Sequence, residues 1–155
     1  MKQLSSRFVG EELSHATMRT EDLIPSFMYF LQSVADQCEI TKEVYTIQDE
    51  VDKLELEEHK GYGTYYKDQE TASYILNEDI WDLLNEIAPE FCYFGSHEGD
   101  GAAYGFWTSD EALSEYILGE LDNIDSDREY MFIPDYQQVR AVCENILEVL
   151  NNHDR

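Results

Sequence analysis

The sequence predicts an α+β fold: a mostly helical single domain of about five helices with a central antiparallel β-hairpin near residues 91–107. In several segments apolar residues recur at intervals of three and four, which is typical of helices with one buried side. Two short aromatic runs flank a glycine-rich stretch, which is typical of a hairpin. The chain has 155 residues, 43% of them apolar, and no linker rich in Pro, Gly or Ser divides it. That is enough to build one hydrophobic core.

Three helices are expected before the hairpin. Their starts are indicated by Thr20, Thr41 and Asn77, whose side chains are of the kind that caps helix N-termini. Acidic Glu21 and Asp22 follow Thr20, and such charges stabilise the positive end of a helix dipole. The glycines of GYGTYY interrupt the helical pattern between the second and third helices. The expected helices span about residues 20–38, 41–54 and 77–89.

The hairpin is indicated by the runs FCYF and AYGFW on either side of the glycine-rich SHEGDGA. After it, Ser109 with acidic residues at 110 and 111 is expected to start a fourth helix that ends near residue 120. A short strand is expected at residues 130–133. Asp135 is expected to cap a final helix that reaches Leu150.

The chain is very acidic, with 34 Asp and Glu residues against 10 Lys and Arg residues and a net charge of -24. Binding to nucleic acid draws its affinity from Lys and Arg that neutralise phosphates. The composition therefore excludes a broad phosphate-binding surface, and an anionic membrane surface is disfavoured for the same reason.

This charge is unevenly distributed along the chain. Residues 1–67 hold 13 acids and 7 bases, whereas residues 68–127 hold 16 acids and no base. Residues 128–155 hold 5 acids and 3 bases. The middle stretch therefore carries two-thirds of the net charge without the interspersed bases that protein surfaces usually have.

This acidic stretch is open to two interpretations. In the first, it is a solvated face that keeps the protein soluble. In the second, its carboxylates imitate the phosphates of DNA, because acids one helical turn apart, such as Glu78, Asp82 and Glu86, make a row of negative charge. The acidic partner-binding candidates are Glu78, Asp79, Asp82, Glu86, Asp110, Glu111 and Glu115.

The hairpin adds two further candidate sites. Tyr104 and Trp107 are candidate aromatic anchors for a partner protein, although aromatic residues that alternate along a strand are most often core. His97, Glu98 and Asp100 are weak candidates for metal ligands. A turn is the preferred interpretation of this segment, because Glu-Gly-Asp-Gly is a common turn sequence and no second histidine is nearby. No cofactor is expected.

Nothing in the local pattern indicates an enzyme, because no set of Ser, His and acidic residues is suggested. The three cysteines, Cys38, Cys92 and Cys143, are widely spaced and are expected to be reduced structural thiols. No apolar stretch is long enough for a signal peptide or a membrane helix, so a cytoplasmic protein is expected.

Two segments, MRTEDLIPSFMYFL and LNEIAPEFCYFGSHEGDGAAYGFW, resemble segments of small, acidic, mostly uncharacterised proteins of bacteriophages and other mobile elements. The resemblance covers about a quarter of the chain and implies no catalytic residues. It implies a bacterial cytoplasm as the setting. Small acidic proteins of this setting are often inhibitors of host defence nucleases, including DNA mimics and anti-CRISPR proteins.

The leading hypothesis is therefore a non-enzymatic inhibitor that occupies the basic groove of a host nucleic-acid-binding protein, without binding nucleic acid itself. The alternative is an interaction or accessory module that works through the aromatic hairpin, with its charge serving solubility alone.

Overall fold

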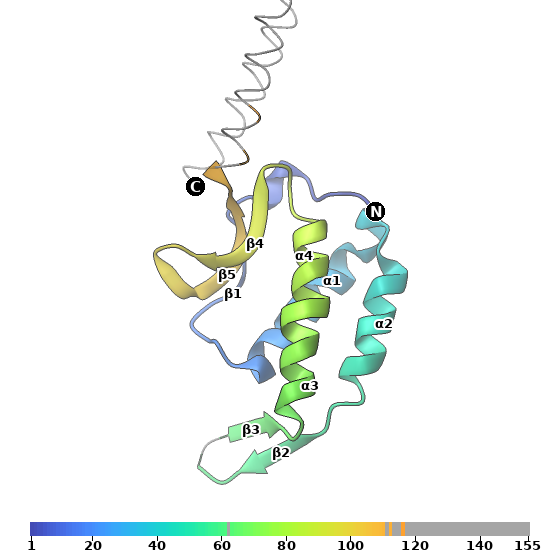
Figure 1. Cartoon of the computed structure of the whole chain (residues 1–155), viewed down its shortest axis with the longest axis vertical. Helices are drawn as coiled ribbons and strands as arrows, with labels where there is room; N and C mark the ends of the chain where they lie inside the picture. The colour runs from blue at the N-terminus through green and yellow to red at the C-terminus, as the bar shows by residue number, and fades with distance from the viewer. Residues whose placement is uncertain (62, 111, 113–115, 117–155) are drawn as a thin grey trace, which may run out of the picture.

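Three long helices and two small antiparallel sheets form the part of the chain that the structure describes (Figure 1). The structure is a computed structural model and describes residues 1–61, 63–110, 112 and 116. The helical elements are η1 (Ser6–Phe8), α1 (Thr20–Cys38), α2 (Thr41–Val51), α3 (Gln69–Tyr74), η2 (Ile75–Ile80) and α4 (Trp81–Glu86). The strands are β1 (Glu12–Ser14), β2 (Leu56–His59), β3 (Gly63–Tyr66), β4 (Cys92–His97) and β5 (Asp100–Thr108).

The third long helix consists of α3, η2 and α4, which follow one another without a break. Its middle part, η2, is π-helical. The N-terminal cap of this third helix is Asp68, whose side chain accepts a hydrogen bond from the Thr71 N–H. The expected cap at Asn77 is therefore wrong, because a better-placed carboxylate begins the helix two turns earlier and Asn77 lies inside it.

The other two helices begin where the sequence predicts, but the expected capping role of Thr41 is wrong, because its hydroxyl donates to Asp36 Oδ1 and no side chain caps α2. Thr20 and Thr41 are the first helical residues, and Arg19 and Ile40 occupy the capping positions before them. α2 ends at Val51, short of the predicted end near residue 54.

The predicted hairpin is present as β4 and β5, which pair from Cys92 with Thr108 to His97 with Asp100. β5 also pairs with β1, so the sheet has the order β1-β5-β4. Gly105 allows this close approach, because a Cβ atom there would lie 2.3 Å from the carbonyl oxygen of Glu11. Neither β1 nor the separate hairpin of β2 and β3 was expected from the sequence.

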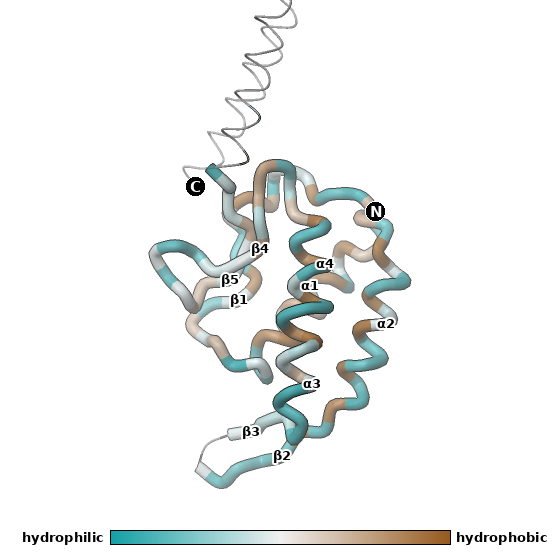
Figure 2. Tube along the Cα trace, in the orientation of Figure 1, coloured by the Kyte–Doolittle hydropathy of each residue, from teal (hydrophilic) through white to brown (hydrophobic). Residues whose placement is uncertain are grey.

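The core lies between the three long helices and the three-stranded sheet, and the buried apolar side chains form one cluster. Phe27 of α1 is fully buried, and its ring meets that of Phe94 edge-on at 5.0 Å. Phe106 of β5 is also fully buried and contacts Phe94 at 5.6 Å. Figure 2 shows hydrophilic and hydrophobic residues alternating along α2 and along the third helix, as expected of helices with one buried side.

The predicted α+β class is confirmed, whereas the described residues contain three long helices rather than about five. The start of the expected fourth helix is visible, because Asp110, Ala112 and Tyr116 are helical and the Ser109 Oγ accepts a hydrogen bond from the Ala112 N–H. The remainder of that helix, the strand expected at residues 130–133 and the helix expected after Asp135 lie outside the described residues.

Within the described segments, no helix combines the length and the hydrophobicity needed to cross a membrane.

Candidate functional site

The acidic candidates of the third helix lie on its outer side. Glu78, Asp82 and Glu86 are exposed and Asp79 is half-buried, while the opposite side of the helix is buried in the core. Asp82 and Glu86 are four residues apart in regular α-helix, as predicted. Glu78 and Asp79 belong to the π-helical η2, whose wider turn changes the spacing of its side chains relative to α4.

Asp79 shows that acids from two helices come together at this surface. Burial raises the pKa of the Asp79 carboxyl, and the charges of Glu50, Asp82 and Glu78 raise it further. Glu50 belongs to α2, which packs against η2. The predicted row is therefore one part of a wider surface, which we call the α2–α4 acidic face and define as Glu50, Glu78, Asp79, Asp82 and Glu86.

None of these five acids forms an ion pair with any residue that the structure describes. Lys53 lies on α2 but binds Asp49, with 2.7 Å between its Nζ and Oδ2 of Asp49. Lys2 and Lys67 pair with other acids of the first 67 residues. The charge of Glu50 contributes to raising the pKa of Lys53, so this base lies near Glu50 without forming an ion pair with it.

Of the two predicted aromatic anchors, Tyr104 is part of the core. Its side chain is 8% exposed, and its ring lies 5.9 Å from those of both Phe27 and Trp81. The prediction that Tyr104 is a surface anchor is therefore wrong. Trp107 points to the other side of the sheet and is half-buried. Its Nε1–H donates a hydrogen bond to the carbonyl oxygen of Gly95.

The weak metal candidates of the hairpin take part in its turn. The Nδ1 of His97 accepts a hydrogen bond from the Gly99 N–H, and Oδ1 of Asp100 accepts one from the Ala102 N–H, each at 3.0 Å. No group of three or more His, Cys, Asp or Glu side chains in the described ranges could hold a metal ion. The segment is therefore interpreted as a turn, and Glu98 is an exposed residue at its tip.

The remaining acidic candidates follow β5. Asp110 is exposed, and its charge together with that of Glu98 adds to the effect of burial in raising the pKa of Tyr93. Glu111 and Glu115 lie outside the described residues. The structure thus brings the acids of the third helix together with Glu50 and leaves the placement of Glu111 and Glu115 undescribed.

The described cysteines have the surroundings of structural thiols. Cys38 is fully buried, and burial raises its pKa. Burial raises the pKa of Cys92 to about 11. A thiol of so high a pKa is almost entirely protonated at neutral pH and is a poor nucleophile. Cys143 lies outside the described residues.

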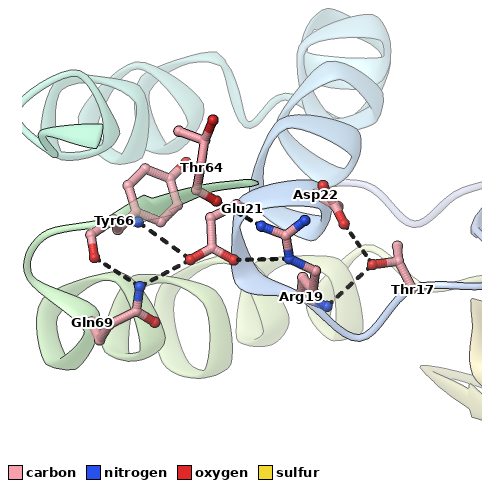
Figure 3. A network of polar contacts seen from close by, with 7 residues as sticks. All are labelled: Thr17, Arg19, Glu21, Asp22, Thr64, Tyr66 and Gln69. Atoms are coloured by element: carbon pink, nitrogen blue, oxygen red, sulfur yellow. Dashed lines mark hydrogen bonds and ion pairs between the residues drawn. The ribbon is translucent and has the colours of Figure 1, made fainter. Parts of the chain in front are cut away.

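A polar network that the sequence did not indicate joins the start of α1 to β3 and α3 (Figure 3). Glu21 Oε1 accepts hydrogen bonds from the Tyr66 N–H at 3.2 Å and from Gln69 Nε2 at 2.9 Å. Its other carboxylate oxygen is 3.8 Å from Nε of Arg19, and Nη2 of Arg19 donates to the Thr64 carbonyl at 2.6 Å. The residues of this network are far apart in the sequence, so no local sequence pattern could have revealed the network.

Glu21 is charged despite its position in this network. Burial favours a raised pKa, but hydrogen bonds from Gln69 and from the backbone N–H groups of Glu21 and Tyr66, together with the Arg19 charge, lower it below the usual value for glutamate. The network is therefore a structural clamp between α1 and the β2–β3 hairpin, and it is separate from the acidic face.

Comparison of this chain with protein families, with curated protein sequences and with solved structures found no match.

Proposed function

We propose that the protein is a non-enzymatic inhibitor that uses the α2–α4 acidic face to occupy the basic groove of a nucleic-acid-binding protein, as a mimic of DNA. The observation that carries this proposal is the convergence of acids from two helices on one surface, where none of them forms an ion pair with a described base. Such a surface repels itself, as the raised pKa of Asp79 indicates. A binding role explains why that repulsion is retained.

The spacing of the charges supports the proposal. The α2 helix packs against η2, and the charge of Glu50 reaches Asp79 closely enough to raise its pKa. Asp82 and Glu86 lie one turn apart on α4, while Glu43, exposed and two turns before Glu50, extends the acidic side of α2. Negative charge is therefore distributed over two neighbouring helices, as the phosphates of DNA are distributed over two strands.

The class of partner follows from the same chemistry. Lys and Arg side chains that contact phosphates respond to negative charge before any base is read. The resemblance to phage and mobile-element proteins favours a host defence nuclease as the partner. By inhibiting it, the protein would have anti-restriction or anti-CRISPR activity in a bacterial cytoplasm. Electrostatic steering would make association fast and sensitive to salt.

The alternative function is an interaction module that uses the hairpin, with the acidic face serving solubility. Because Tyr104 is buried, Trp107 is the candidate anchor that the hairpin retains. The two functions therefore depend on different residues.

The test begins with capture of bacterial proteins on the immobilised chain, followed by elution with salt or with duplex DNA and identification of the eluted proteins. Affinity for a captured, purified protein is then measured for two matched variants. The face variant carries Glu78→Gln, Asp82→Asn and Glu86→Gln. The control variant carries Glu11→Gln, Asp36→Asn and Glu98→Gln, which are exposed acids outside the face.

The two variants lose equal charge, so a difference between them reports position. We expect the face variant to bind at least about tenfold more weakly and the control to change by less than about threefold. Equal losses would show that bulk charge alone is recognised. Loss of binding in Trp107→Ala with unchanged affinity in the face variant would favour the hairpin module instead.

A further inference from the structure

The β2–β3 hairpin has one closed edge and one open edge. Lys67 N–H donates a hydrogen bond to the Glu55 carbonyl, and Leu56 pairs with Tyr66 and Glu58 with Thr64. In an antiparallel ladder, hydrogen-bonded and non-bonded pairs alternate. The pairs Leu56–Tyr66 and Glu58–Thr64 are therefore the non-bonded ones, and their N–H and C=O groups point outward from the hairpin.

On β3, these outward groups are occupied by the clamp described above. Glu21 accepts from the Tyr66 N–H, and Arg19 donates to the Thr64 carbonyl (Figure 3). β3 is also the strand that packs against α1 and α3. The inner edge of the hairpin therefore cannot accept another strand.

On β2, the corresponding groups face away from the molecule. β2 is the outermost strand at the foot of Figure 1, and all of its residues are exposed, including Leu56 at 54%. No described side chain is hydrogen-bonded to the outward N–H or C=O groups of Leu56 and Glu58. A strand edge of this kind is a template for pairing with another extended segment.

Two backbone N–H groups on the outer edge of β4 are occupied, in contrast. Asn85 Oδ1 accepts a hydrogen bond from the Phe94 N–H at 3.0 Å, and the Pro89 carbonyl accepts one from the Cys92 N–H at 2.9 Å. Specific groups thus occupy two N–H groups of β4 and the Tyr66 N–H and Thr64 carbonyl of β3, whereas the outward groups of Leu56 and Glu58 on β2 have no partner among the described residues.

We propose that the outer edge of β2 is a docking site for a basic, extended segment of a partner protein, which joins the hairpin as a third strand. The strand begins LEE, and Glu58 has no ion-pair partner among the described residues. Glu57 and Glu58 project to opposite faces of the hairpin, so Lys or Arg side chains on either face of an added strand would lie beside one of these carboxylates. This site is distinct from the acidic face and does not depend on the function proposed for it.

A depression on one side of the hairpin supports this choice of partner. It has a volume of about 420 Å³ and is lined by Glu57, His59, Tyr65, Tyr66, Lys67 and Gln69. The Lys67 ammonium is held by Glu55, and Oε2 of Glu57 lies 3.9 Å from Nε2 of His59. A basic side chain that enters from the β2 side would therefore meet Glu57 beside His59.

A second copy of the chain is a poor occupant of this edge. Antiparallel self-pairing of β2 would bring Glu57 and Glu58 close to their own counterparts, and like charges on facing strands are destabilising. Each copy also carries a net charge of -24.

The test uses the full chain and the blocked peptide Lys-Val-Lys-Val-Lys-Val-Lys as a model basic strand. Its control is the same peptide with N-methylated backbone amides, which keeps the charge but cannot pair as a strand. The protein variants are Glu58→Pro and Glu58→Gln. Both remove one carboxylate, but only proline removes the outward N–H, and proline at such an edge position breaks no bond to β3.

We expect the unmodified peptide to bind, to slow amide exchange at Leu56 and Glu58, and to bind Glu58→Pro about tenfold more weakly than Glu58→Gln. The N-methylated peptide is expected to leave both amides unprotected. Three results would overturn the proposal: equal binding of the two peptides, protection on α4 instead of β2, and self-association of the chain through β2. The two peptides are compared on the unmutated chain, so the test stands even where Glu58→Pro disturbs the hairpin.

Discussion

At the scale of single residues, Asp79 shows the repulsion within the acidic face most directly. Burial and the charges of Glu50, Asp82 and Glu78 raise its pKa. The folded protein therefore holds the Asp79 proton more tightly than the unfolded chain does. By linkage, the stability that depends on this proton is present at low pH and is lost as pH rises from about 4, the ordinary value for aspartate, through the raised folded pKa.

We predict that Asp79→Asn stabilises the protein at pH 7, by about 0.5 kcal/mol, because it removes several like-charge contacts. The gain should disappear below about pH 3, where the carboxyl is largely protonated in both states. Urea unfolding of both proteins across this pH range measures it. Asp36→Asn, which removes a charge from an exposed site on α1, should show no such gain. Destabilisation by Asp79→Asn at pH 7 would contradict the repulsion.

The burial of Tyr104 and the partial exposure of Trp107 show how far the sequence could predict the positions of single residues. Tyr104 and Phe106 are two positions apart, so they share one side of β5, and both are buried. Trp107 belongs to the other side. The alternation was visible in the sequence, but which side faced the helices depended on contacts with Phe27 and Trp81.

At the scale of elements, Glu21 connects α1 to the β2–β3 hairpin. Its carboxylate accepts a hydrogen bond from the Tyr66 N–H, a backbone donor on the inner edge of β3, and forms an ion pair with Arg19. Glu21→Gln keeps an acceptor for this N–H but loses the charge. Glu21→Ala loses both and leaves the Arg19 guanidinium and the Tyr66 N–H without this partner.

We predict that Glu21→Ala lowers the free energy of unfolding by about 1–3 kcal/mol, as expected when a partly buried donor loses its partner. Glu21→Gln should cost less, about 1 kcal/mol. Urea denaturation gives both values. Native-state hydrogen exchange should show faster exchange at Tyr66 in the alanine variant, with little change at Phe94. Equal losses for the two variants would mean that charge, and not the hydrogen bond to β3, holds the hairpin.

The elements that the sequence predicted correctly are those with a periodic pattern. Helices α1 and α2 and the β4–β5 hairpin have apolar spacing or aromatic runs that indicate their type. β1 and the β2–β3 hairpin lack this signal, because β1 is three residues long and all four residues of β2 are exposed. The start of the third helix was missed because Asp68 is followed by the polar residues Gln69 and Glu70, which gave no apolar period.

At the scale of the whole molecule, the net charge of -24 acts on the stability of the fold as well as on binding. The candidate site, like the fold, was only partly predictable from the sequence. The acidic stretch was visible in the sequence, but the contribution of Glu50 required the packing of α2 against η2, and Glu50 is far from Asp79 along the chain.

We predict that NaCl stabilises the protein at pH 7, because added ions screen repulsion among acids such as those of the α2–α4 acidic face, none of which forms an ion pair in the described structure. Between about 0.01 and 0.5 M NaCl the Debye length falls from about 30 Å to below 8 Å, so most of the gain should occur below about 0.2 M. Thermal unfolding at fixed pH measures this, with about 2–4 °C expected per kcal/mol. The face variant should gain less from salt than the control variant, although their charges are equal, because its acids repel one another at short range. Equal gains would show that the repulsion is spread over the whole surface and that the acidic face is not its centre.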